Sequence, residues 1–162
     1  MIVNHFLSPA LSQISSCPSD VVANFDSDNL KTYKNKFCYM LVGNQELDYK
    51  DAETFCANNG GGTLFMPRTA TQNSLILNLM DDAGVDRPAW IGISDRETEG
   101  DFVYADGSEL ELNAFNVFVN PIFAYVQDCV ALDPSTGLWN KYRCANTFLS
   151  NARRPFVCQY SI

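Results

Sequence analysis

Six cysteines constrain what this 162-residue chain can fold into more than any other feature. Their number is even, and they are spread along the chain instead of clustering as the Cys-x-x-Cys pairs of zinc sites, which favours three disulfides. Sequence alone permits 15 pairings of six cysteines. Disulfides form in oxidising compartments, so we expect a secreted, extracellular protein. The six are Cys17, Cys38, Cys56, Cys129, Cys144 and Cys158.

Length and composition fit one folded domain. Hydrophobic residues make up 46% of the chain and charged residues 19%, as in globular proteins. No run approaches the roughly 18–20 apolar residues that a membrane helix needs, so we do not expect the chain to span a membrane. The net charge of -8 repels phosphate backbones, and nucleic acid is therefore not an expected partner.

The first sixteen residues, 1–16, are expected to be an N-terminal extension. They lack a basic head, and their apolar run is broken by Ser8, Pro9 and Ser12, which is atypical of a signal peptide. We expect that a leader is missing from this sequence. No Asn-x-Ser/Thr sequon supports secretion independently.

Hydrophobic periodicity predicts two amphipathic helices followed by short strands. The first helix follows a cap at Asp48, carries Cys56 and stops at Asn59-Gly60, and the second runs from Thr69 or Thr71 to Gly84. Strands are predicted near residues 90–93, 102–104, 129–132, 138–140 and 156–160. Two helices followed by strands predict an α+β domain.

The stretch from Cys129 to Cys158, with its Trp139-Asn140 pair, resembles the C-terminal half of a C-type lectin-like domain. The resemblance extends over residues 17–162. It implies an α+β fold of two helices on short, mostly antiparallel sheets, with a long loop region. The landmarks follow the family order: Cys38-Tyr39, Cys56, Trp90-Ile91-Gly92-Ile93, Gly100 to Asp106-Gly107, Cys129, Trp139-Asn140, Cys144 and Cys158.

The resemblance also implies how the cysteines pair and where the two tryptophans lie. Cys56 pairs with Cys158 and Cys129 with Cys144, which leaves Cys17 with Cys38 as the extra bridge of the long form. Trp90 and Trp139 are expected to be core residues and not ligand-stacking platforms.

Sugar-binding members of this family use a primary calcium ion, and most of its expected ligands are altered here. The proline-containing ligand motif falls on Val119-Asn120-Pro121, the usual glutamate is Gln127, and the aspartate after Asn140 is Lys141. Calcium prefers six to eight oxygen ligands, several of them charged. We therefore expect no calcium at the primary site.

Three carboxylates match an accessory calcium site of some family members: Asp95, Glu99 and Asp128. They are expected to hold at most a weakly bound calcium ion. The alternative is that the acidic segment 95–101 is a solvated turn.

The long loop, residues 112–126, is unusually apolar. Phe115, Val117 and Val119 alternate with their neighbours as in a strand. Either most of these side chains fold back onto the core, or they form a contact patch for a protein partner or a second copy of the chain.

Catalysis is not expected, because the one histidine, His5, lies near the N-terminus and the cysteines are expected to be paired. The favoured function is carbohydrate recognition without the primary calcium. The candidate ligand-binding residues are Asn120, Gln127, Asn140, Lys141 and Tyr142, with Tyr125 as a second stacking face. The alternative is a protein-binding module that has kept the scaffold, since one fold hosts many functions.

Overall fold

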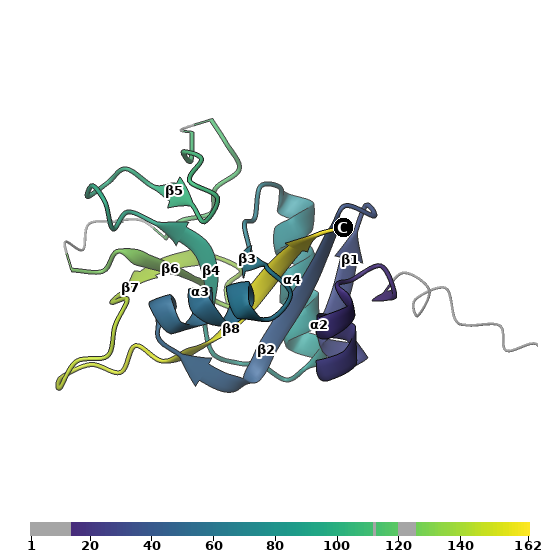
Figure 1. The fold of residues 1–162 in the computed structure, drawn as a ribbon. Helices are drawn as coiled ribbons and strands as arrows, with labels where there is room; N and C mark the ends of the chain where they lie inside the picture. The colour runs from purple at the N-terminus through teal and green to yellow at the C-terminus, as the bar shows by residue number, and fades with distance from the viewer. Residues whose placement is uncertain (1–13, 112, 120–125) are drawn as a thin grey trace, which may run out of the picture.

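A computed structural model describes residues 14–111, 113–119 and 126–162, and these form an α+β domain (Figure 1). The helices are α2 (Ser19–Asn24), the 3-10 turn η1 (Ser27–Asn29), α3 (Tyr49–Asn58) and α4 (Ala70–Asp82). The strands are β1 (Leu30–Tyr33), β2 (Phe37–Leu47), β3 (Thr63–Leu64), β4 (Ala89–Ser94), β5 (Val103–Tyr104), β6 (Cys129–Leu132), β7 (Trp139–Tyr142) and β8 (Arg154–Ser161).

These strands form one sheet with the order β1-β2-β8-β4-β6-β7, to which β3 adds on β8 and β5 on β4. Strand pairs are antiparallel except β4 with β8, which meet in parallel at Trp90 and Phe156. The fold is therefore α+β with a mostly antiparallel sheet, as predicted, although it is one mixed sheet.

Both predicted helices begin where their capping residues indicate. The Asp48 side chain accepts a hydrogen bond from the Asp51 backbone N–H at 3.2 Å, and Thr69 Oγ1 accepts one from Gln72 N–H at 3.2 Å. α3 ends before Gly60, whose φ of +93° favours glycine. The short helix α2 and the strands β1 and β2 were not foreseen.

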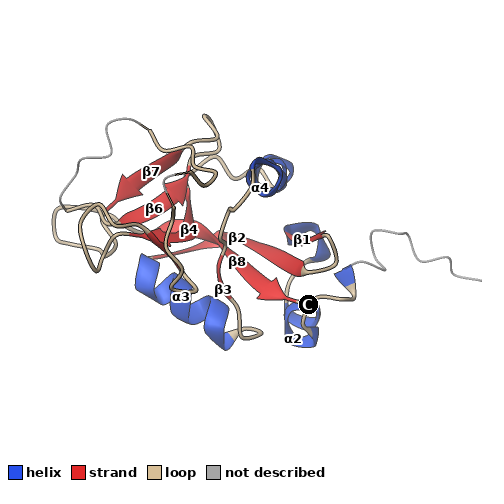
Figure 2. Ribbon diagram, turned by 90° about the horizontal axis from the view of Figure 1, so that it is seen from above, coloured by secondary structure: helices blue, strands red, loops and turns tan. Residues whose placement is uncertain are grey.

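Each face of the sheet carries its own hydrophobic cluster and its own helix. Along β2, Met40 and Val42 belong to the cluster beneath α3, and Tyr39 and Leu41 belong to the cluster beneath α4. Figure 2 shows α3 and α4 on opposite sides of the strands. Every site residue on a strand therefore belongs to one of two opposite faces.

Trp90 and Trp139 are both fully buried, as predicted. The Trp90 indole N–H donates to the Leu47 carbonyl at 3.0 Å, and the Trp139 indole N–H donates to Asn73 Oδ1 at 2.9 Å. Each indole is thus hydrogen-bonded within the core and has no free polar edge for a ligand.

All three disulfides expected from the resemblance are present: Cys17–Cys38, Cys56–Cys158 and Cys129–Cys144. Cys56–Cys158 joins α3 to β8 across a sequence separation of 102 residues. In the chain-entropy account, closing a loop of that length stabilises the fold by about 4–5 kcal/mol. In the part of the chain that the structure describes, no helix has the length and apolar character to cross a membrane.

Candidate functional site

Strand β7 carries the candidate residues on alternating faces of the sheet. Trp139 and Lys141 are buried, whereas Asn140 and Tyr142 are partly exposed. Successive side chains of a strand point to opposite faces. Lys141 therefore lies on the α4 side with Trp139, and Tyr142 packs against the cluster on the α3 side.

The Lys141 ammonium is held by two carboxylates from the segment after β4. Its Nζ donates to Asp95 Oδ2 at 2.7 Å and to Glu99 Oε1 at 2.9 Å. The side chains of Lys141, Asp95 and Glu99 are 3%, 0% and 36% exposed, respectively. A buried lysine and a buried aspartate thus form the centre of this site, with a half-exposed glutamate at its edge.

Asp95 also organises the backbone around the ammonium. Its Oδ2 accepts a hydrogen bond from the Gly100 N–H at 3.0 Å, and its own N–H donates to the Asp128 carbonyl at 3.0 Å. Lys141 Nζ also lies 5.4 Å from the ring centre of Phe102. Asp95 therefore joins β7 and Gly100 through its carboxylate, and the residue preceding β6 through its backbone.

Charge is unbalanced here, because Asp128 is a third carboxylate near one ammonium. Burial, together with the charges of Asp95 and Glu99, raises the pKa of Asp128. Burial alone would lower the pKa of Lys141, but the hydrogen bonds to Asp95 and Glu99 raise it on balance. Within the described residues, Asp95 Oδ1 and Asp128 Oδ1 are buried without a hydrogen-bond partner.

These three carboxylates are the predicted accessory calcium ligands, and two of them already bind a cation that belongs to the protein. A calcium ion would have to displace the ammonium from both Asp95 and Glu99. Across residues 14–111, 113–119 and 126–162, no group of three or more His, Cys, Asp or Glu side chains is arranged to hold a metal. The donor set fits an internal ammonium better than a bound calcium.

The remaining candidates lie on the α3 side of β7, shortly before β6, or outside the described residues. The Arg154 guanidinium lies 3.7 Å from the Tyr142 ring centre and 5.2 Å from that of Trp90. Burial raises the pKa of Tyr142, while Arg154 and a hydrogen bond with Asn140 lower it in part. Gln127 is half-buried, and Asn120 and Tyr125 lie outside the described residues.

Two consequences follow for the predicted ligand-binding set. The structure separates Lys141 from the Asn140–Tyr142 pair, and it adds Arg154, which the sequence analysis missed. Nothing in the sequence signals the Arg154–Tyr142 stack, because it forms between strands β7 and β8. Arg154 Nε is buried and has no hydrogen-bond partner among the described residues.

The described part of the long loop packs on the domain. Phe115 and Phe118 meet the Trp139 ring edge-on at 5.5 and 5.3 Å between ring centres, and Phe118 lies 4.6 Å from Phe102. The predicted strand is reduced to a single bridge between Phe118 and Trp139. Val126 is 57% exposed, and the part of the loop in residues 120–125 lies outside the described residues.

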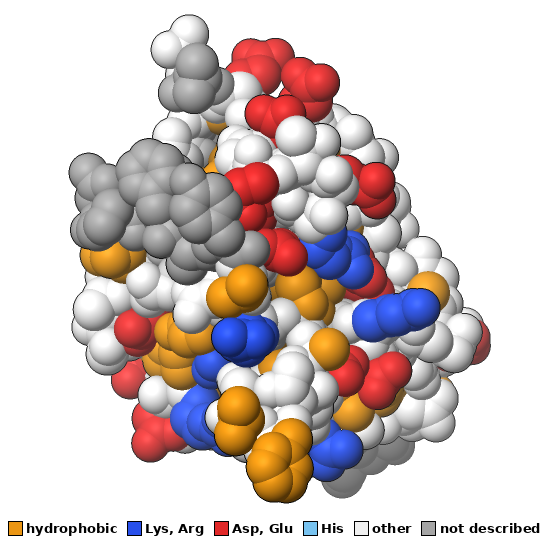
Figure 3. All heavy atoms as spheres, turned by 90° about the vertical axis from the view of Figure 1, so that its left-hand side faces the viewer, with side chains coloured by type: hydrophobic (Ala, Val, Ile, Leu, Met, Phe, Trp, Pro, Cys, Tyr) orange, Lys and Arg blue, Asp and Glu red, His pale blue; other side chains and the backbone are white. Residues whose placement is uncertain are grey.

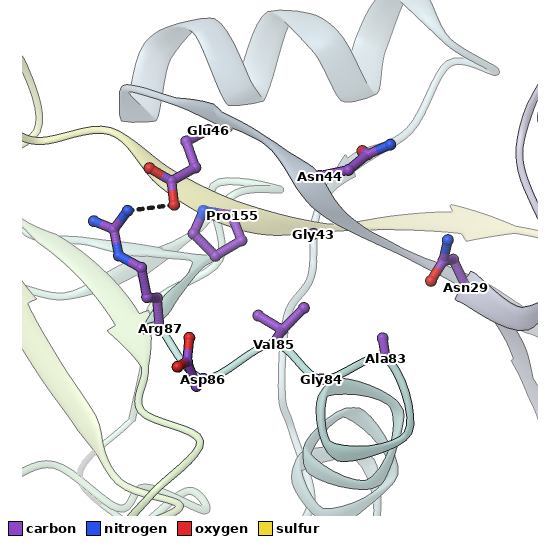
Figure 4. Close-up of a pocket in the computed structure, with 10 residues that line it drawn as sticks. All are labelled: Asn29, Gly43, Asn44, Glu46, Ala83, Gly84, Val85, Asp86, Arg87 and Pro155. Atoms are coloured by element: carbon purple, nitrogen blue, oxygen red, sulfur yellow. Dashed lines mark hydrogen bonds and ion pairs between the residues drawn. The ribbon is translucent and has the colours of Figure 1, made fainter.

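A hollow of about 300 Å³ opens elsewhere, between β2 and the turn that follows α4 (Figure 4). Its charged lining residues are Glu46, Asp86 and Arg87, of which Arg87 and Glu46 form an ion pair with each other. The close-up shows the Val85 and Pro155 side chains pointing into the hollow. With its one basic side chain already paired, this hollow is a weaker candidate than the surface around β7.

The mixed sheet, the helices on its two faces and the three disulfides are those of the C-type lectin domain, and the chain belongs to this family. The family model described as the lectin C-type domain matches residues 45–160.

Among curated proteins, the chain is 37% identical to Collectin-10 of Xenopus tropicalis and 38% identical to Collectin-11 of Bos taurus. Each match spans 123 residues, which is 75% of this chain and 42% of the relative. The chain thus spans less than half the length of these collectins. Among solved structures, a mouse scavenger receptor C-type lectin carbohydrate-recognition domain matches with a TM-score of 0.66 and 22% identity, covering 82% of this chain and 94% of that one.

Proposed function

We propose that this domain is a secreted, non-catalytic module that recognises a carbohydrate without calcium at the primary site. The observation that carries the proposal is the Lys141 ammonium bound between Asp95 and Glu99. The position that holds a calcium-ligating aspartate in sugar-binding relatives here supplies a positive charge. Membership of the lectin family and the collectin relatives support carbohydrate as the ligand class.

The lysine supports calcium-free recognition because its ammonium binds the carboxylates that a calcium ion would otherwise bind. A cation between carboxylates neutralises their mutual repulsion and fixes the segment that carries them. The ammonium satisfies Asp95 and Glu99, and Asp95 in turn holds the Gly100 N–H. The conformation of the 95–100 segment is thereby fixed by side chains of the protein itself instead of by a bound ion.

Asn140, Tyr142 and Arg154 are the groups we expect to face the ligand. An amide beside an aromatic ring suits the alternating polar and apolar surface of a sugar. The half-buried Arg154 guanidinium, stacked on Tyr142, adds a cationic donor, and charge-assisted hydrogen bonds to carboxylate or sulfate groups are about twice as strong as neutral ones. We therefore expect an acidic carbohydrate.

A glycan array probed in calcium and again in chelator tests this proposal. We expect equal binding in both conditions, weakened by Asn140→Ala and by Arg154→Gln. The control Asn24→Ala, at an exposed asparagine on α2, should bind like the wild type. Binding only in calcium would contradict the calcium-free mechanism, and binding in neither condition would favour a protein ligand.

Thermal unfolding with increasing calcium gives an independent measurement. A ligand that binds only the folded state raises the melting temperature. We expect no rise for the wild type in low-millimolar calcium. A clear rise that disappears in Asn140→Ala would show that the primary site still binds calcium.

A further inference from the structure

The segment between β7 and β8 presents two adjacent hydrophobic side chains to solvent at its tip. Phe148 is 102% exposed and Leu149 is 90% exposed, the highest values of any large hydrophobic residue in the described part of the chain. In Figure 1 this segment projects at the lower left, beyond the body of the domain. Adjacent, fully exposed apolar side chains indicate a contact site.

The tip is held in place at several points. Thr147 and Ser150 exchange backbone hydrogen bonds of 3.0 and 3.2 Å across Phe148 and Leu149. Behind them, the Ala152 N–H donates to Asn146 Oδ1 at 2.7 Å, and Cys144 is tied to β6 by its disulfide.

The turn does not require hydrophobic residues at its centre. Two-residue turns favour Asn, Asp and Gly, which are polar or small. Folding therefore gives no reason for Phe148 and Leu149, whereas a binding partner does.

The charges beside the tip indicate the charge that the partner surface carries. Arg143 and Arg153 flank the segment, both are exposed, and neither forms a salt bridge with any residue the structure describes. The complementary surface is an apolar hollow with an acidic rim, because buried aromatic anchors supply affinity and rim charges supply orientation.

The same chain carries such a surface beside β5. A hollow of about 640 Å³ is lined by Phe102, Leu110 and Phe118, with acidic residues around it. None of these acidic residues forms a salt bridge among the described residues. They are Glu97, Asp101, Glu109 and Glu111.

We propose that the Phe148–Leu149 tip of one copy inserts into the acid-rimmed hollow of a second copy, so that the domain self-associates. Figure 3 shows the face where the upper part carries carboxylates and no basic side chains, and hydrophobic side chains at the lower edge lie among Lys and Arg. A two-fold axis across such a face places the lower part of each copy on the upper part of the other. Both tips then bind at once, as in closed symmetric dimers.

A lipid surface is the other occupant that a basic, apolar tip suggests. The net charge of -8 and the carboxylates on the same face oppose approach to an anionic bilayer. The same carboxylates favour a second copy. Self-association is independent of the proposed carbohydrate function, because it does not use Asn140, Tyr142 or Arg154.

Sedimentation velocity over a concentration series tests the contact with two variants. Phe148→Ser/Leu149→Ser removes the tip, and Glu97→Lys/Glu111→Lys reverses charge on the rim. All four positions are exposed, so folding should be preserved. Val22→Ser, a 38% exposed position on α2, is the control for loss of an exposed hydrophobic residue.

We expect the wild type and Val22→Ser to dimerise, more weakly at high salt, and each of the two variants to be monomeric alone. An equimolar mixture of the two should recover dimers held by one of the two contacts, weaker than those of the wild type, because one copy keeps its hollow and the other keeps its tip. A wild type that is monomeric throughout, a tip variant that still dimerises, or a mixture that stays monomeric would overturn the proposal. If a monomeric wild type co-sediments with phosphatidylserine vesicles and the tip variant does not, the tip serves a membrane instead.

Discussion

Replacing Lys141 by methionine tests whether the buried ammonium holds the site together. Methionine keeps much of the aliphatic stem but removes the charge, which leaves the fully buried Asp95 carboxylate with only the Gly100 N–H as a donor. Breaking a buried pair by removing one partner typically costs about 3–5 kcal/mol. Glu99 adds little because its side chain is 36% exposed.

The loss should be visible in both chemical and thermal unfolding. In a domain of this size each kcal/mol shifts the melting temperature by about 2–4 °C, so we expect a fall on the order of 10 °C. Urea titration followed by tryptophan fluorescence gives the free energy of unfolding.

Two further variants separate a charge effect from a packing effect. Lys141→Met/Asp95→Asn removes both charges and should recover much of the stability that Lys141→Met loses. Lys50→Met, at an exposed lysine on α3, should stay within about 0.5 kcal/mol of the wild type. The reasoning fails if Lys141→Met is as stable as Lys50→Met, or if the double variant is no more stable than Lys141→Met.

Three other perturbations follow from the structure. Burial and neighbouring carboxylates raise the pKa of Asp128, so its contribution to stability becomes more favourable as the pH falls through that raised value. Asp128→Asn should therefore stabilise the protein at neutral pH and flatten the pH dependence of urea unfolding. Removing Cys56–Cys158 should lower the free energy of unfolding in guanidinium titrations by about 4–5 kcal/mol, against about 3 kcal/mol for Cys129–Cys144, whose sequence separation is 15 residues. Equal losses would contradict the chain-entropy account. Phe118→Ser should destabilise by about 2 kcal/mol because its ring packs on Trp139 and Phe102, whereas the exposed Val126→Ser should have no effect on the melting temperature.

The helices were predictable because their signals are local. Asp48 and Thr69 cap α3 and α4 as their positions indicate, and the apolar positions recur at helical spacing. The long strand β2 was missed for the opposite reason. Its first half is buried on both faces and reads as an uninterrupted apolar run, which periodicity cannot assign.

The turn that leads into β2 hid the hairpin as well. Lys34 and Asn35 both have positive φ, at 53° and 51°, so the turn adopts a conformation that usually signals itself by glycine. β1 and β2 pair across this turn, from Tyr33 opposite Phe37 to Leu30 opposite Met40. With no glycine and no alternation, only Asn35, a residue type that tolerates positive φ, marked the turn.

The candidate site was predictable in its members but not in its arrangement. Asp95, Glu99, Asp128 and Lys141 were all singled out, yet the acids were assigned to one site and the lysine to another. The alternation of β7 already separates Asn140 from Lys141, but the partner of Lys141 lies 46 residues away in sequence. Only the register of β7 on β6, and the Asp95–Asp128 backbone bond, bring them together.

This arrangement means that restoring the family aspartate should not restore calcium binding. Position 141 faces Asp95 and Glu99, so Lys141→Asp removes the internal cation and adds a fourth acidic residue to a region that already contains three. We expect this variant to be less stable than Lys141→Met, because like charges repel where methionine is neutral. Unfolding of both variants with and without calcium measures the difference. If calcium restored Lys141→Asp to wild-type stability and made its glycan binding depend on Asn140, the lysine would be a simple replacement within an otherwise intact calcium site.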